Sequence, residues 1–156
     1  MIFISHRGNI NSKNTTLENK PSYIQEALNL DYHVEIDLWV LNNILFLGHD
    51  NPKYSIDISF LNNEKLFVHC KNFEALSFLK HKKLKCDYFW HENDHYTLTS
   101  KGNIWSHFKS VILEDSIKVC LEFENLDFSS CYGICSDDIE SFKKKYSQSN
   151  RTVSIN

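Results

Sequence analysis

The sequence predicts an α/β fold whose core is a sheet of parallel strands. Two observations favour this class. Short apolar runs recur along the chain, and a segment with helical spacing of apolar residues separates the first two runs. A strand, a loop, a helix and a second strand in this order are typical of a βαβ unit. The 156 residues indicate one domain, residues 1–156, which is far shorter than a complete (β/α)8 barrel of ~250 residues.

The clearest elements lie at the start of the chain. Residues 2–5 form a short apolar run typical of a buried parallel strand, and Gly8 then allows a sharp turn. Residues 9–19 are polar and predict a loop. Pro21 suits the first turn of a helix over residues 21–30, where apolar side chains recur at helical spacing.

The next strand is expected over residues 32–40, because its side chains alternate in character. One face carries Val34, Ile36 and Leu38, and the other carries His33, Glu35, Asp37 and Trp39. Two carboxylates turned toward the interior of a fold are costly unless a cation or a partner charge neutralises them. Asn42-Asn43 predicts a tight turn, so residues 44–47 should return as a hairpin arm that brings His49 to the same end.

The second half of the chain carries a weaker pattern. Residues 66–70 predict a strand, residues 73–79 a helix, and residues 87–90 a strand that leads into His91. Further short strands are expected at 103–106, 118–123 and 132–135, with a closing helix at 138–146. The connections here are too short for a helix between every pair of strands, so several helices should be missing or reduced.

Composition excludes several classes of protein. The net charge of -3 and the lack of a basic tract argue against a nucleic-acid partner. No stretch approaches the ~20 apolar residues of a membrane span, so no membrane partner is expected. The amino terminus shows no export signal, and the five cysteines form no CxxC pair, which predicts buried, reduced thiols and a cytoplasmic location. The oligomeric state is left open.

Ionisable residues gather in the first third of the chain, each beside an apolar run. They are His6-Arg7-Gly8, Glu18-Asn19, Glu35-Ile36-Asp37 and Gly48-His49-Asp50. We expect them to meet at one end of the strands and to form an active site. Each has a structural alternative, since a single histidine after a strand can be a hydrogen-bonded core residue and two acids on one strand face can point to solvent.

In this order and spacing, the four motifs resemble those of the glycerophosphodiester phosphodiesterase family, within the phosphatidylinositol-phospholipase-C-like phosphodiesterases. The resemblance covers residues 2–71 and is faint beyond them. It implies a TIM barrel, which in so short a chain would be a shortened TIM-like (β/α) barrel with several helices of the second half missing or reduced. It also implies a divalent metal at the carboxyl ends of the strands.

The resemblance implies a role for each matching residue. His6 and His49 correspond to an acid/base pair, Arg7 to a phosphate ligand that takes part in catalysis, and Glu35 with Asp37 to metal ligands. In the later Glu-x-Lys motif of the family, this chain reads His69-Cys70-Lys71. Lys71 therefore fits as a catalytic and substrate-binding cation.

His69 stands where the family has a metal-binding glutamate. Mg²⁺ or Ca²⁺ is the expected metal, but imidazole is a softer ligand than carboxylate. Mn²⁺ or Zn²⁺ therefore stays open, as does a third ligand from Glu92, Asp94 or water. Glu18 is expected as a further ligand beside the metal, although it could simply favour the amino end of the following helix. His91 is expected to contact the substrate.

The sequence therefore predicts a metal-dependent phosphodiester hydrolase for a small soluble diester, such as a glycerophosphodiester or a nucleotide-linked alcohol. Arg7 and the metal would neutralise the phosphate while the two histidines move protons. Two alternatives stay open. One is a phosphate-binding module that lost turnover through the His69 exchange, and the other is a phospholipase-type transferase that gives a cyclic phosphate.

Overall fold

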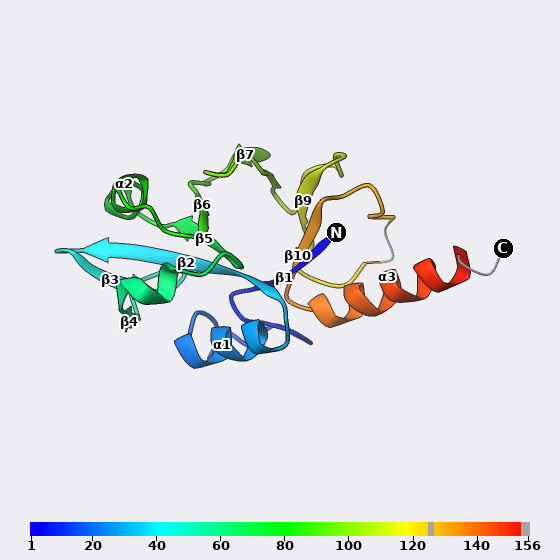
Figure 1. Ribbon diagram of the computed structural model, residues 1–156, viewed down its shortest axis with the longest axis horizontal. Helices are drawn as coiled ribbons and strands as arrows, with labels where there is room; N and C mark the ends of the chain where they lie inside the picture. Colours follow the sequence, from blue (N-terminus) through cyan, green and yellow to red (C-terminus); the bar gives the residue numbers. More distant parts are fainter. Residues whose placement is uncertain (125–126, 154–156) are drawn as a thin grey trace.

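The computed structural model describes residues 1–124 and 127–153. Within this part the chain forms a large sheet with helices on its outer side (Figure 1). The strands are β1 (Ile2–His6), β2 (His33–Leu41), β3 (Ile44–Leu47), β4 (Tyr54–Ile56), β5 (Leu66–Cys70), β6 (Asp87–Phe89), β7 (Tyr96–Leu98), β8 (Ile104–Ser106), β9 (Ser116–Val119) and β10 (Gly133–Ser136). The α-helices are α1 (Pro21–Asn29), α2 (Phe73–His81) and α3 (Ile139–Val153), and a short 3-10 helix spans Ile58–Leu61.

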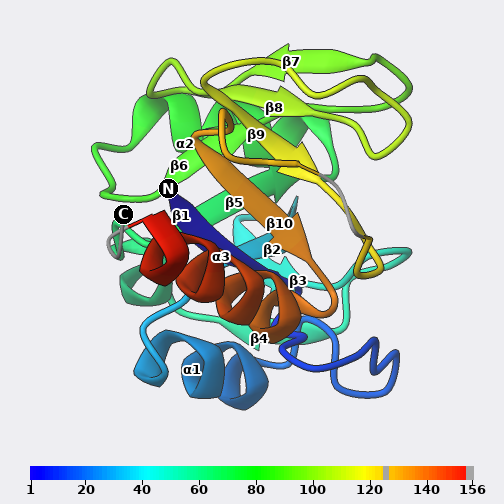
Figure 2. The same cartoon turned by 90° about the vertical axis from the view of Figure 1, so that its right-hand side faces the viewer.

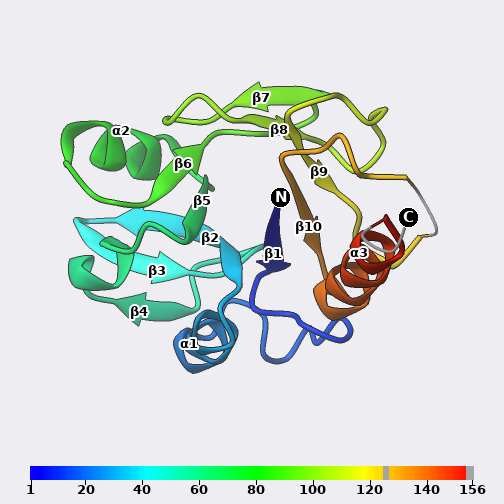
Figure 3. The same cartoon turned by 45° about the vertical axis from the view of Figure 1, so that its right-hand side comes forward.

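Parallel pairing runs through most of the sheet. The order β6, β5, β2, β1, β10, β9 and β8 is parallel throughout, and β7 pairs antiparallel with β8. The β3–β4 ribbon pairs antiparallel with the carboxyl half of β2, beyond the point where β1 ends. The strands curl about a common interior, with the helices outside the curl (Figure 3).

The shortened TIM-like barrel predicted from the sequence is wrong. The described chain is a curled half-barrel of ten strands with three α-helices, and strand and helix do not alternate. Only α1 and α2 are crossover helices between parallel strands, and loops and a hairpin connect β6 through β10. The physical reason lies in those short connections. They leave no room for the outer helical layer that a TIM barrel needs, and antiparallel ribbons at β3–β4 and β7–β8 take the place of βα units.

A side chain, rather than a strand ladder, joins the two ends of the curl. The buried Asp87 carboxylate at the start of β6 accepts hydrogen bonds from the Thr99 and Ser100 hydroxyls, both at 2.7 Å, and from the Asn103 side-chain amide at 2.9 Å. The backbone N–H of Ser100 also donates to the Tyr88 carbonyl at 2.8 Å. The β7–β8 turn is thereby tied to β6 although no strand pairing is recorded between them in the described residues.

Apolar residues cover both faces of the sheet. On the outer face, Val34, Ile36 and Leu38 are fully buried against α1 and α2, as the alternation in β2 predicts. On the same side, α3 packs across β1 and β10 (Figure 2). The inner face has an apolar floor, which consists of Ile4, Phe67, Phe89, Trp105, Ile117, Val119 and Cys135. The acidic face of β2 therefore points into the curl and not to solvent.

Most elements of the first half match their predicted residues, and those of the second half match less well. The helix at 21–30 is confirmed as α1, the strand at 66–70 as β5, and the hairpin after residues 42–43 as β2–β3. In the second half, the strand expected at 118–123 is β9, which ends at Val119, and the closing helix extends to Val153. β4 and β7 were not predicted. The five cysteines are free and buried, as expected.

None of the helices in the described part of the chain has the length and apolar character that crossing a membrane requires.

Candidate functional site

The carboxyl ends of β1 and β5 and the amino half of β2 open into one cavity of about 810 Å³. Seven of the predicted site residues line it: His6, Arg7, Glu35, His49, His69, Lys71 and His91. They come from five separate segments of the chain, on or directly after β1, β2, β3, β5 and β6. The parallel pairing explains the convergence, because His6 pairs with Glu35 across β1 and β2, and Asp37 pairs with His69 across β2 and β5.

A tight turn after β1 sets the position of Arg7. Arg7 adopts φ 54° and its backbone N–H donates to the Glu35 carbonyl at 2.9 Å, so the ladder ends at this residue. Gly8 follows with φ 94°, and a Cβ there would lie 2.7 Å from the Tyr23 ring. Glycine is therefore required both by the backbone conformation and by the close approach of α1.

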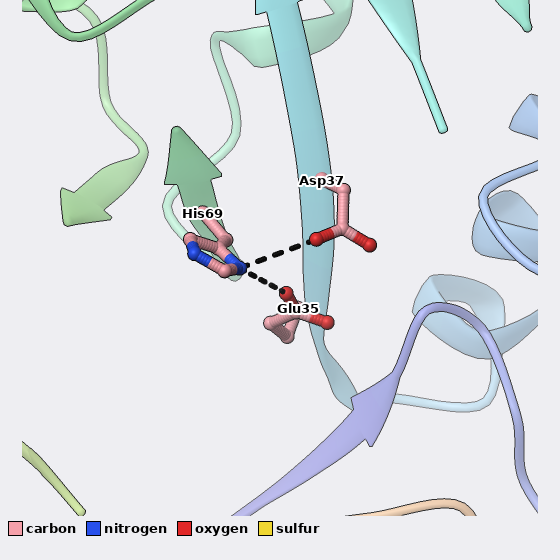
Figure 4. Close-up of side chains that lie close together, drawn as sticks. All are labelled: Glu35, Asp37 and His69. Carbon is pink, nitrogen blue, oxygen red and sulfur yellow. Dashed lines mark ion pairs between the residues drawn. The ribbon is translucent and has the colours of Figure 1, made fainter. Parts of the chain in front are cut away.

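Glu35, Asp37 and His69 form the centre of the site (Figure 4). The two acids are two residues apart on β2 and therefore share one face. His69 Nδ1 lies 3.2 Å from Asp37 Oδ1 and 3.9 Å from Glu35 Oε1. One ligand atom from each of the three residues lies within 4.8 Å of the other two. This spacing fits a single metal ion.

Asp37 is fully buried but well compensated. Arg7 Nε lies 2.9 Å from Asp37 Oδ2 in an ion pair that is not aligned as a hydrogen bond, and Lys71 Nζ lies 3.6 Å from Oδ1. The Asn19 side chain donates to Oδ2 at 2.8 Å and accepts from the Asp37 N–H at 2.9 Å. Burial alone would raise the pKa of Asp37, but the contact with His69 and the charges of Arg7 and Lys71 hold the pKa well below its usual range.

Glu35 is less well compensated. Burial and the neighbouring charge of Asp37 raise its pKa, and His6, Arg7 and His69 offset only part of this effect. Among the described residues, Glu35 Oε2 and Asp37 Oδ1 have no hydrogen-bond partner. Buried polar atoms without partners are costly. A divalent cation would satisfy both oxygens, so the residues present fit the metal that the resemblance implies.

His6 is held by an aspartate from the far end of the chain. Its Nδ1 lies 2.7 Å from Asp137 Oδ1, and its Nε2 lies 3.8 Å from Glu35 Oε2. Asn9 donates to the same Asp137 oxygen at 2.8 Å. Burial would raise the pKa of Asp137, but the hydrogen bonds from His6 and Asn9 lower it. The aspartate therefore stays ionised and orients the imidazole.

Glu18, which the sequence predicts as a further metal ligand, lies outside the group formed by Glu35, Asp37 and His69. Its carboxylate pairs with Arg7 Nη1 at 3.4 Å and accepts from the Asn9 amide at 3.0 Å. Glu18 is neither among the cavity-lining residues nor in the ligand group of the described chain. These contacts orient the guanidinium of Arg7 from the side opposite Asp37.

His49 is the most exposed of the predicted catalytic residues. Its side chain is 40% exposed, and its Nδ1 lies 2.6 Å from Asp50 Oδ1. Burial is the main cause that lowers its pKa. The preceding Gly48 has φ 150°, and a Cβ there would lie 2.1 Å from the Asn51 carbonyl oxygen. The turn that delivers His49 to the cavity therefore depends on glycine.

An aromatic part of the cavity wall comes from the second half of the chain. It consists of Phe89, Trp90, His91, Trp105, His107 and Phe108. Neither ring nitrogen of His91 has a hydrogen-bond partner in the described structure, and burial lowers its pKa to about 4. His91 is therefore neutral at pH 7, with one donor and one acceptor available to a ligand.

Sequence reasoning assigned no role to three residues that support the site, namely Asn9, Asn19 and Asp137, although Asn19 belongs to one of the motifs. Asp137 directly follows β10, so the rule that found His6 and Lys71 at strand ends could have identified it. Asn19 has φ 62°, a conformation that asparagine tolerates, but no sequence signal indicates its two hydrogen bonds to Asp37.

No model of a known protein family matches the chain, and no curated protein or solved structure matches it either. The chemistry of the site is therefore argued from its own residues.

Proposed function

We propose that this protein is a metal-dependent phosphodiester hydrolase that acts on a small soluble diester, such as a glycerophosphodiester or a nucleotide-linked alcohol. The observation that carries the proposal is the convergence of two imidazoles, a guanidinium, an ammonium and a buried carboxylate pair around one cavity. The motif resemblance to glycerophosphodiester phosphodiesterases supports the same chemistry, although the fold is not the barrel of that family.

Arg7 and Lys71 would bind the phosphate. Asp37 and Glu18 contact the Arg7 guanidinium from two sides and leave its remaining N–H donors for the substrate. Burial would lower the pKa of Arg7, but the carboxylates around it raise the pKa instead, so the side chain stays cationic. A metal held by Glu35, Asp37 and His69 would act as Lewis acid toward the phosphate when bound.

His6 and His49 would transfer the protons. In each ring Nδ1 contacts an aspartate oxygen, which accepts a hydrogen bond from Nδ1–H and leaves Nε2 for the reaction. One histidine would remove a proton from the attacking water or substrate hydroxyl, and the other would protonate the departing alcohol. The two rings come from different segments, which is consistent with work on opposite sides of the phosphate.

The proposal is tested by hydrolysis of bis(p-nitrophenyl) phosphate and glycerophosphocholine in the presence of added divalent ions. EDTA, His6→Ala and His49→Ala should each abolish turnover because they remove the metal or a proton-transfer group. His81→Ala is the matched control, since this exposed histidine lies on α2 away from the cavity.

The products separate the alternatives. Phosphorus NMR that shows a monoester supports hydrolysis, whereas a stable cyclic phosphate supports the transferase. Binding of glycerol phosphate without turnover of any diester, across all ions tested, would contradict the hydrolase and favour the phosphate-binding module. We further propose a cytoplasmic location, supported by the five free thiols, which a reducing compartment preserves.

A further inference from the structure

The imidazole in the ligand group distinguishes this chain from the family that its motifs resemble. We propose that His69 Nδ1 binds the metal together with Glu35 and Asp37, and that this ligand set selects Mn²⁺, Co²⁺ or Zn²⁺ over Mg²⁺ and Ca²⁺. The inference deepens the proposed function and rests on it for the presence of a metal at this place.

The hydrogen bond on the far side of the ring sets which nitrogen of His69 can bind a metal. His69 Nε2 lies 2.8 Å from the His91 carbonyl oxygen. A carbonyl oxygen only accepts, so Nε2 carries the proton and the lone pair of the neutral ring is on Nδ1. Metal-binding histidines commonly donate their second N–H to a backbone carbonyl in this way.

The ring is also held in the orientation that such a ligand requires. His69 stacks on Phe89 with centroids 5.2 Å apart and planes inclined by 7°. Nδ1 then faces Asp37 Oδ1 and Glu35 Oε1 (Figure 4). In the neutral ring this nitrogen lone pair faces two carboxylate oxygens, which repel it unless a proton or a metal ion lies between. The arrangement is therefore complementary to a bound cation.

The unpartnered oxygens point to the same conclusion. Glu35 is 3% exposed and Asp37 is fully buried, and each has one oxygen without a hydrogen-bond partner. Arg7 and Lys71 form ion pairs with Asp37, whereas the recorded contacts of the Glu35 carboxylate with basic side chains of the described chain are with the imidazoles of His6 and His69. Glu35 therefore has no direct ion pair with a lysine or arginine of the described chain, and a cation beside His69 would supply a charged partner.

The chemistry of the ligands decides which cation. Mg²⁺ and Ca²⁺ are hard ions that prefer oxygen ligands, whereas imidazole suits transition ions. Three protein ligands at the edge of an open cavity leave coordination positions for water and substrate, as in catalytic zinc sites. We expect the affinity to rise from Mg²⁺ and Ca²⁺ through Mn²⁺ and Co²⁺ to Zn²⁺.

Calorimetric titration of the metal-free full chain with each ion tests this order. The wild type should bind Zn²⁺ and Co²⁺ at least about tenfold more tightly than Mg²⁺. His69→Glu restores an all-oxygen set and should shrink the ratio of Zn²⁺ to Mg²⁺ affinity by roughly 10- to 100-fold. His81→Glu makes the same exchange on the exposed face of α2 and should leave the ratio unchanged.

Two spectroscopic readouts are independent of turnover. The visible spectrum of bound Co²⁺ should weaken and shift in His69→Glu, because loss of the nitrogen ligand changes the ligand field. In the wild type, Zn²⁺ should shift the NMR signals of the His69 ring and leave those of His81 in place. This second measurement keeps the proposal testable even if a His69 variant fails to fold.

The outcomes separate this inference from the proposed function. A wild type that binds Mg²⁺ more tightly than Zn²⁺ would overturn the role of His69. So would an affinity ratio that does not change in His69→Glu together with His69 ring signals that Zn²⁺ does not shift. Neither result would contradict the hydrolysis of diesters. Imidazole-dependent selectivity without hydrolysis of any diester would support this inference and overturn the hydrolase. A chain that binds none of these ions would overturn both.

Discussion

The two halves of the sheet are held together and used differently. In the first half, β1, β2 and β5 pair in parallel, and consecutive registers bring His6, Glu35 and His69 to one end. In the second half, β6 through β9 supply short strands, an aromatic wall and a hydrogen-bonded joint at Asp87. The comparison teaches that the register of strand pairing positions the charged groups of the site, whereas side-chain contacts shape the aromatic wall of the cavity.

The largest expected effect lies at the joint. Asp87→Ala removes the acceptor for the Thr99, Ser100 and Asn103 side chains and leaves these donors without a partner. We expect a loss of about 3 kcal/mol or more in the free energy of unfolding, since a hydrogen bond to a charged group contributes about 1.5–3 kcal/mol. Urea denaturation measures this loss. A variant as stable as wild type would show that the joint does not hold the β7–β8 turn.

A glycine from each half provides the next test. Gly8→Ala should destabilise the fold by about 2 kcal/mol, because the methyl group meets Tyr23 at 2.7 Å and the backbone has φ 94°. Gly102→Ala, at φ 87° with no atom within 4 Å of the added Cβ, should cost only about 1 kcal/mol. Thermal and urea unfolding of both variants give the difference, and equal losses would mean that contact with Tyr23 adds nothing.

Asp137 connects the two halves, and its substitution should have a smaller effect, on catalysis. Asp137→Asn should lower kcat by about tenfold, a part of the roughly 10²- to 10⁴-fold effect of general acid–base catalysis, because His6 loses its orienting carboxylate. Steady-state kinetics with bis(p-nitrophenyl) phosphate measure this change. An unchanged rate would show that the charge of Asp137 does not assist His6 in the reaction.

The same carboxylate predicts a dependence of stability on pH. The pKa of folded Asp137 lies below its usual value, so its ionised form stabilises the fold above about pH 4. This contribution is lost as the pH falls through the pKa of the folded state. Asp137→Asn should therefore narrow the difference in stability between neutral and acidic solution, as acid titration of the unfolding free energy would reveal. An unchanged pH profile would contradict the assigned contacts of Asp137.

The smallest effect is expected in the aromatic wall. Phe108 lines the cavity and is 46% exposed, so Phe108→Ala should raise KM a few fold and leave kcat nearly unchanged. Such a result would limit the aromatic wall to binding of the substrate. A large fall in kcat would instead give the wall a part in the chemical step and blur the contrast between the halves.

Much of the candidate site could be predicted because its residues stand next to recognisable strands. Arg7 and Lys71 lie directly after β1 and β5, and the alternation in β2 puts Glu35 and Asp37 on one face. Glu18 illustrates the limit. Its place in the motif indicated a metal neighbour, whereas its contacts are with Arg7 and Asn9. A loop residue has no periodicity that fixes its direction.

By itself, the sequence determined most of the strands in the first half, β4 excepted, and which chemical groups stand at their ends, because period-two alternation and apolar runs are local properties. The tertiary structure decided that the sheet is a curled half-barrel, that Asp137 meets His6 across 131 positions of sequence, and that the His91 carbonyl turns Nδ1 of His69 toward two carboxylates. These outcomes depend on contacts between segments far apart in the sequence and on the lengths of the connections between strands. Local sequence periodicity does not determine either of them.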